Sequence, residues 1–351
     1  MSLKRKLLKA KSIFIEYKWD IISFLIISLI ISIIGFHLNA WTGDLKGDDA
    51  YLHAGWIQYI LDNFPHINWY HQFYIGYPPF NFDVPTYYLL IALFNKITTL
   101  SVILLIQITM WLSMIALGLS AYILARVLKF QRLPALGFSL LMFTMDITWN
   151  YLVIGGAYNR IIALPFVFIS IALAYSHVRN INESVKNTKI YVASVVVFTI
   201  LALLHPLIWQ WTFVFISGIY LIGINDWKQK LLNIIKTILP VALLSVWLYL
   251  PLFRAYGASL SSPAGGTAND TTLMQFHWLI YLPSRFVWSI DLGPLILPLA
   301  LLGLLFAGIY YKRIISHRNQ IKLELKIIIC FFALCTYFFA YGWLPMPKST
   351  Y

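Results

Sequence analysis

Apolar runs long enough to cross a membrane recur along this chain, and they constrain its fold more than any other feature. A hydrocarbon core about 30 Å thick needs roughly 20 apolar residues in one helix. Of the 351 residues, 60% are hydrophobic and 11% are charged, whereas soluble domains carry about 25% charged residues. The sequence therefore predicts an all-α polytopic membrane protein. Nearly charge-free stretches cover 21–40, 97–125, 133–150, 161–178, 190–224, 237–253, 292–311 and 327–345.

The stretch 190–224 is too long for one ordinary span, and His205-Pro206 stands at its middle. Because proline interrupts helices, two spans are predicted to meet there, which gives about nine spans in all. The first span follows a basic start and precedes no small-residue cleavage site, so it is interpreted as an uncleaved signal anchor. One transmembrane domain is expected over 1–351; it ends directly after a span, either at a natural terminus or inside a larger protein.

The distribution of Lys and Arg predicts the orientation. With the amino terminus in the cytoplasm, the inner segments carry 6, 3, 3, 3 and 5 of the 26 basic residues. The positive-inside rule then holds at each inner segment and the carboxyl terminus lies outside. The net charge of +13 is read as a topology signal, and no nucleic-acid partner is expected. The inner segments are 1–20, 126–132, 177–189, 225–236 and 312–326.

Two long outer loops, 41–96 and 254–291, hold most of the acidic side chains that lie away from the basic ends. Long ordered loops are usually functional. The first is rich in aromatic residues and is predicted to fold into short amphipathic helices on the membrane. Its segment 84–96 must lie in the interface, because a span there would place Arg126 and Arg132 outside.

The spans themselves hold almost no ionisable groups, although a carrier would place such groups near mid-membrane. Charges at the outer rim favour chemistry at the interface over passage through the bilayer. A lipid or solute carrier or flippase and a non-catalytic assembly subunit stay open as alternative functions.

The first candidate site is the acidic segment that follows the first span. If a helix begins at Asp48 or Asp49, that residue is its N-cap. Asp49 and His53 are then four residues apart on one helix face. A carboxylate beside an imidazole suits general-base catalysis or metal binding. The alternative is a capping Asp with an interfacial His.

Further candidates are cationic or aromatic residues of the outer side. Arg160 follows Gly155-Gly156 and could bind a phosphate with its guanidinium fork, or extend to lipid head groups. His205 is either a hydrogen-bonded structural residue or part of the site. Tyr77 lies in a proline-aromatic connector that could form a wall for a lipid-linked substrate. The second loop adds interfacial anchors that could together form the far wall: Arg254, His277 and Arg285.

The order of these segments resembles the GT-C superfamily of membrane glycosyltransferases, most closely the membrane proteins called "6-pyruvoyl-tetrahydropterin synthase-related". The residues that carry the resemblance are Asp49 with His53, then Gly76-Tyr77-Pro78-Pro79-Phe80-Asn81-Phe82, then Pro85-Thr86-Tyr87-Tyr88. It is best over about 20–165, and beyond about 180 it rests on topology.

The resemblance implies transfer of a sugar from a polyprenyl-phosphate donor to a glycan, lipid or protein acceptor on the outer face of the cell membrane. The catalytic base of the superfamily maps to Asp49 or to its neighbour Asp48. Cationic side chains would stabilise the leaving polyprenyl phosphate; Arg160, Arg254 and Arg285 are candidates on chemical grounds. The Asp48–Asp49 pair permits a divalent metal such as Mg²⁺ or Mn²⁺ without requiring one. Membrane lipids are the other expected partners.

Overall fold

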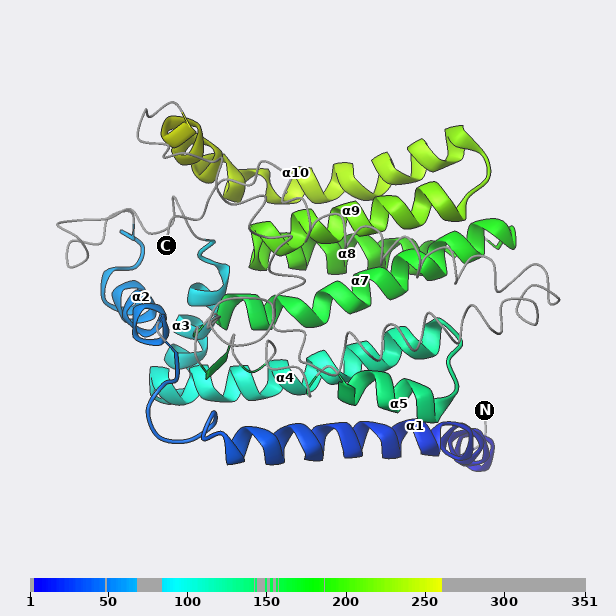
Figure 1. Ribbon diagram of the computed structural model, residues 1–351, viewed down its shortest axis with the longest axis horizontal. Coiled ribbons are helices and arrows are strands. Elements are labelled where there is room, and N and C mark those ends of the chain that lie inside the picture. The colour runs from blue at the N-terminus through cyan, green and yellow to red at the C-terminus, as the bar shows by residue number, and fades with distance from the viewer. Residues whose placement is uncertain are drawn as a thin grey trace, which may run out of the picture.

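Helices are the only regular elements in the described part of the chain, which in this computed structural model comprises residues 3–47, 49–67, 84–141, 143, 149, 152–153, 156, 158–185 and 187–260. Seven long or medium helices lie side by side along one direction, and two short ones lie at one end of that bundle (Figure 1). The seven are α1 (Leu3–His37), α4 (Val102–Val127), α5 (Arg132–Leu141), α7 (Tyr158–Asn182), α8 (Thr188–Leu204), α9 (Pro206–Gly223) and α10 (Trp227–Leu260).

These seven helices fall on the first seven predicted spans. Four contain segments long and apolar enough to cross a membrane, at Tyr17–His37, Val102–Val127, Tyr158–Asn182 and Trp227–Trp247. Helices α5, α8 and α9 are apolar but shorter. For the described residues, the prediction of an all-helical protein with helices long and apolar enough to span a membrane is thus confirmed. The spans predicted at 292–311 and 327–345 lie outside them.

The predicted break at His205-Pro206 is present, and local chemistry accounts for it. Helix α8 ends at Leu204 and α9 begins at Pro206. His205 has extended backbone angles between them, and its Nδ1 accepts a hydrogen bond from the Ile208 amide at 3.4 Å. Pro206 occupies the first turn of α9, where its missing N–H removes no helical hydrogen bond.

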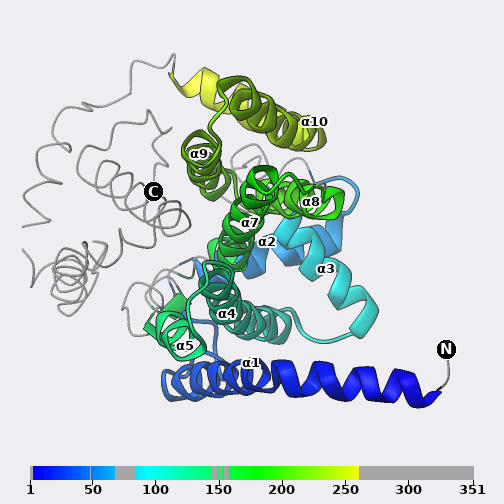
Figure 2. The same cartoon turned by 90° about the vertical axis from the view of Figure 1, so that its right-hand side faces the viewer.

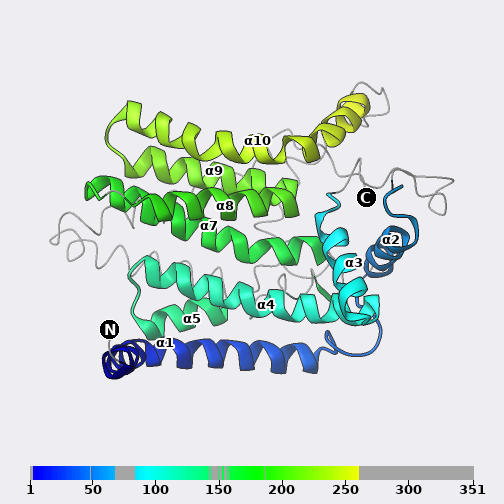
Figure 3. The same ribbon diagram turned by 180° about the vertical axis from the view of Figure 1, so that it is seen from behind.

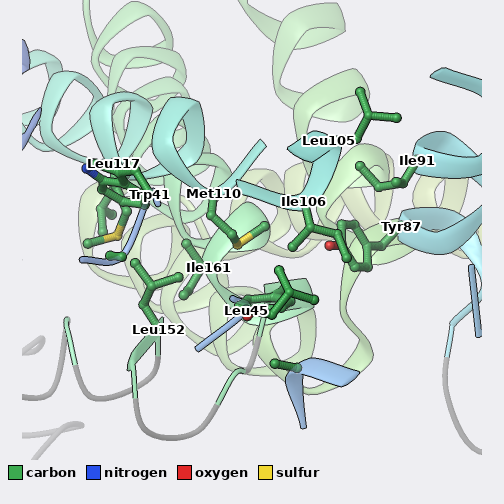
Figure 4. Packing of buried hydrophobic residues seen from close by; sticks show 14 of the residues in the cluster. Trp41, Leu45, Tyr87, Ile91, Leu105, Ile106, Met110, Leu117, Leu152 and Ile161 are labelled. Atoms are coloured by element: carbon green, nitrogen blue, oxygen red, sulfur yellow. The ribbon is translucent and has the colours of Figure 1, made fainter. Parts of the chain in front are cut away.

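Helix α7 stands at the centre, between α4 on one side and α8 and α9 on the other (Figure 2). Two groups of buried apolar side chains result. One lies among α1 to α5 and the start of α7, where Met110, Leu117 and Ile161 gather (Figure 4). The other lies among α7 to α10. Close approach of α1 and α4 depends on Gly118, because a Cβ there would meet Ile27 Cγ2 at 2.6 Å.

The two ends of the bundle differ in composition. The amino terminus and the basic connection between α9 and α10 lie at one end, called here the basic end (Figure 3). At this end Asp20 of α1 accepts hydrogen bonds from Tyr122 and from Arg126 Nε (3.1 Å), and Arg132 Nε lies 3.4 Å from its other oxygen. One carboxylate therefore joins α1 to α4 and α5.

Helices α2 (Ala50–Asn63) and α3 (Thr86–Thr98) lie at the opposite end, called here the α2 end (Figures 1 and 3). Their 14 and 13 residues span about 20 Å each, too short to cross a bilayer. The predicted short helices of the first outer loop are therefore present, and α3 covers the segment expected to lie in the interface.

Candidate functional site

Asp49 marks the start of α2, as the sequence predicted. It occupies the N-cap position, and its carbonyl accepts a hydrogen bond from the His53 amide at 3.0 Å. Asp49 and His53 are therefore separated by one helical turn at the start of α2, as expected. Asp49 is thus the N-cap residue by position, although its side chain makes no capping hydrogen bond. Asp48, the other candidate base, lies outside the described residues.

His53 is buried among aromatic rings, with 5% of its surface exposed. Its Nδ1 lies 2.9 Å from the Tyr88 hydroxyl, and the two rings stack with centroids 5.6 Å apart. Trp56, Tyr87 and Tyr158 complete a cage, with ring centroids 5.5 to 6.1 Å from that of His53. A side chain so enclosed holds segments together and reaches a substrate only through its neighbours.

Burial lowers the pKa of His53 to about 4, because the enclosed site disfavours the charged imidazolium. A hydrogen bond with the Gly156 backbone acts the other way, and the positive charge of Arg160 lowers the pKa further. His53 is therefore neutral at pH 7. The Gly156 bond favours the protonated ring, so it is a bond donated to the carbonyl. The tautomer of the ring decides which of the two atoms donates in the contact between Nδ1 and the Tyr88 hydroxyl.

Gly156 brings the segment before α7 against the start of α2. A Cβ at Gly156 would lie 2.8 Å from the Ala50 nitrogen and 3.3 Å from the Asp49 nitrogen. Its φ of +62° is also one that residues with side chains rarely adopt. Two positions on, the Tyr158 hydroxyl donates to the Lys46 carbonyl at 2.6 Å. This contact between two of the predicted motifs was not predicted from the sequence. The Gly155-Gly156 pair is the sequence signal that could have indicated it.

Arg160 lies in the first turn of α7, and its charge acts on two of the predicted histidines. It lowers the pKa of His53, and it also lowers that of His205 at the junction of α8 and α9. Burial is the larger cause for His205, whose pKa falls to about 3. The structure thus gathers Asp49, His53, Arg160 and His205, which come from three separate motifs, at the α2 end.

The structure does not describe the side chains of four other predicted site residues. Arg254 belongs to α10, but its side chain is not among those described. Tyr77, His277 and Arg285 lie outside the described residues. No group of three His, Cys, Asp or Glu side chains suited to a metal ion occurs among the described residues. Mg²⁺ or Mn²⁺ at Asp48 and Asp49 stays a prediction.

Four residues of the cage around His53 were not predicted as site residues from the sequence: Trp56, Tyr87, Tyr88 and Tyr158. The Tyr87-Tyr88 pair was noted only as part of a motif, and interfacial aromatic residues are too common to single out. Tyr87 has a buried hydroxyl that forms no hydrogen bond within the described part of the chain. Its oxygen and that of Tyr88 belong to the same short helix, α3.

No protein-family model matches this chain, and no curated protein or solved structure matches it. The motif resemblance to GT-C glycosyltransferases therefore stays a prediction. What the structure itself gives is an all-helical chain over its described residues, with four helices of membrane-span length. At one end of them lie Asp49 and the buried His53 of the short helix α2. Arg160 of α7 acts electrostatically on His53 and on the buried His205 at the α8–α9 junction.

Proposed function

We propose that this chain is a membrane glycosyltransferase that moves a sugar from a polyprenyl-phosphate donor to an acceptor hydroxyl at the α2 end. The observation that supports it best is the packing of Gly156 on the Asp49–Ala50 backbone. That contact places the start of α2, with its carboxylate, beside the segment that leads into Arg160. A base and a phosphate-binding cation are the two groups that this transfer needs.

In the proposed reaction Asp49 accepts the proton of the acceptor hydroxyl. The hydroxyl oxygen attacks the anomeric carbon as the bond from that carbon to the phosphate oxygen breaks. The bonding electrons leave with polyprenyl phosphate, whose negative charge Arg160 stabilises through paired N–H donors. His53 takes no proton, because it is neutral with a pKa of about 4; it holds α2, α3 and Gly156 in place.

A lipid-linked donor suits this position in the fold. The phosphate of such a donor lies at the membrane surface while its chain stays in the hydrocarbon. Helices α2 and α3 are too short to span and lie where the long helices end. The Lys and Arg distribution would put this end outside the cell membrane. A divalent metal at Asp48 and Asp49 is compatible with the scheme.

The test is transfer of a labelled sugar from a polyprenyl-phosphate donor by the purified protein in lipid. Asp49→Asn should lower the rate by about 10²- to 10⁴-fold, the usual range for a lost general base. Asp62→Asn is the matched control: Asp62 lies exposed on the same helix, where Gln58 donates to it at 2.8 Å. Its rate should equal that of the wild type.

Asp48→Asn and the double variant complete the experiment. If Asp48 were the base, the single loss would move to that variant. Wild-type transfer in both single variants and in the double variant would exclude the proposed mechanism. No transfer by the wild-type protein with any donor, despite correct folding, would favour the carrier or assembly-subunit alternatives.

A further inference from the structure

Helix α3 has an apolar face that no part of the described chain covers. Leu90 is 43% exposed, Leu93 54%, Phe94 49% and Ile97 68%. Their spacing of three, four and seven residues places them in one stripe along the helix. Four large apolar side chains side by side form the kind of surface that soluble proteins avoid. This set is called here the α3 stripe.

The opposite face of α3 belongs to the candidate site. Tyr87, Tyr88 and Ile91 are each at most 1% exposed. Leu90 is two residues from Tyr88, so it points about 200° away around the helix. Tyr88 carries the hydroxyl that meets His53 Nδ1 at 2.9 Å. One helix, about 10 Å across, therefore separates the α3 stripe from the His53 cage.

The neighbouring helix indicates what covers the α3 stripe. After the turn at Thr99, exposed apolar residues continue at Leu100, Ile103 and Leu104, and then at Leu112 on α4. Because α4 is long and apolar enough to span a membrane, we expect its exposed side chains to face acyl chains. The stripe continues this surface. The one charged residue of α3 is Lys96, whose long side chain can reach lipid phosphates from a submerged helix.

We infer that α3 lies in the plane of the membrane surface with the α3 stripe immersed in the acyl chains of the leaflet at the α2 end. This immersion holds Tyr88 against His53 from the opposite side. The sequence predicted a helix in the interface; the structure assigns its lipid-facing side and links that side to the candidate site. The inference does not depend on glycosyl transfer.

Spin labels in lipid nanodiscs test the immersion directly. Leu93→Cys and Ile97→Cys would carry a nitroxide in a Cys330→Ser, Cys335→Ser background, with Gln58→Cys on α2 as the exposed control. The stripe labels should collide more with oxygen than with a water-soluble nickel chelate, at a depth of about 5–10 Å. The Gln58 label should show the reverse. Equal access of nickel to all three positions would overturn the inference.

Hydrogen exchange tests the link between the stripe and the site. Leu93→Gln with Ile97→Gln should speed amide exchange in 84–98 by about tenfold and leave α4 unchanged. Thr98→Gln, at an exposed polar position in the last turn of the same helix, is the matched control. It removes bonds to the Phe94 carbonyl and from the Leu100 amide but should leave exchange in 86–93 unchanged. Unchanged exchange in the double variant would refute the link. Both readouts are independent of activity, so a failure here differs from a failure of the transferase proposal.

Discussion

The two ends of the bundle use the same residue types for different purposes. At the basic end, Asp20 meets Tyr122, Arg126 and Arg132, and its carboxylate fastens three helices. At the α2 end, the carboxylate of Asp49 does not even cap its own helix. There the fastening is done by neutral groups, through His53, Gly156 and their aromatic neighbours. The difference is therefore that a carboxylate between two cations fastens the helices at the basic end, whereas neutral groups do so at the α2 end.

Two histidines, His53 and His177, show the same difference between the two ends of the bundle. His53 and His177 each have Nδ1 2.9 Å from a tyrosine hydroxyl, of Tyr88 and of Tyr220. At the basic end the contact continues to Thr237, whose Oγ1 lies 3.3 Å from the Tyr220 hydroxyl, and so joins α7, α9 and α10. At the α2 end it joins two short helices to the segment before Arg160. Similar local pairs therefore serve helix packing in one place and site assembly in the other.

The largest expected effects come from asparagine substitutions at the two aspartates, Asp49 and Asp20. Asp49→Asn should lower the transfer rate by about 10²- to 10⁴-fold. Asp20→Asn should do the opposite: about 1–3 kcal/mol less stable, because two partly buried arginines lose their counter-ion, with activity retained in the folded fraction. Thermal unfolding and transfer rate measured on both variants check this. Equal losses of activity in the two variants would contradict the different roles proposed for Asp49 and Asp20.

The pH dependence of stability should reveal His53. Its pKa is about 4 in the folded protein and 6.5 in an unfolded chain, so the unfolded chain binds the extra proton first. Stability is therefore complete above pH 6.5 and falls as the pH drops towards 4, by roughly 2–4 kcal/mol. His53→Gln should remove the part of this loss of stability that comes from protonation of His53. An unchanged slope in that variant would mean that other groups, such as His205, account for it.

Gly156→Ala should destabilise the α2 end by about 1–3 kcal/mol, since it adds a clash at 2.8 Å to a strained backbone. Gly43→Ala is the matched control. Gly43 has a similar φ of +72°, but nothing lies within 4 Å of its Cβ position. The difference between the two melting temperatures isolates the contact with Ala50. Identical losses would show that backbone strain alone is responsible.

Tyr88→Phe should cost about 1–2 kcal/mol, because it leaves Nδ1 of a buried imidazole without its hydrogen-bond partner. Tyr220→Phe makes the same change at His177 and should destabilise the bundle by a similar amount. The two variants differ in activity: the first should lower transfer several-fold by loosening α3, the second should not. Parallel unfolding and rate measurements separate these outcomes. Loss of transfer in both would contradict a site confined to the α2 end.

Much of the candidate site could be predicted from residue types and spacing, whereas the contacts between distant segments could not. The pairing of Asp49 with His53 is local, so helical geometry was enough to predict it. Arg160 and His205 were each singled out alone, from an isolated cation and a proline-broken span. That Arg160 acts on both His53 and His205 was not predictable, because no local pattern relates α2 to α7 or to the α8–α9 junction. Tyr88 was missed as a site residue for the same reason.

The sequence by itself determined the properties that depend on neighbours in the chain: the apolar spans, the break before Pro206, the start of α2 and the short α3. Only the tertiary structure decided which distant segments meet. Tyr88 lies 35 positions from His53, and Tyr158 lies 112 positions from Lys46. Hydropathy tells which face of a helix is buried, but not which helix covers it. That choice follows from close packing, as where Gly156 admits the backbone of Ala50.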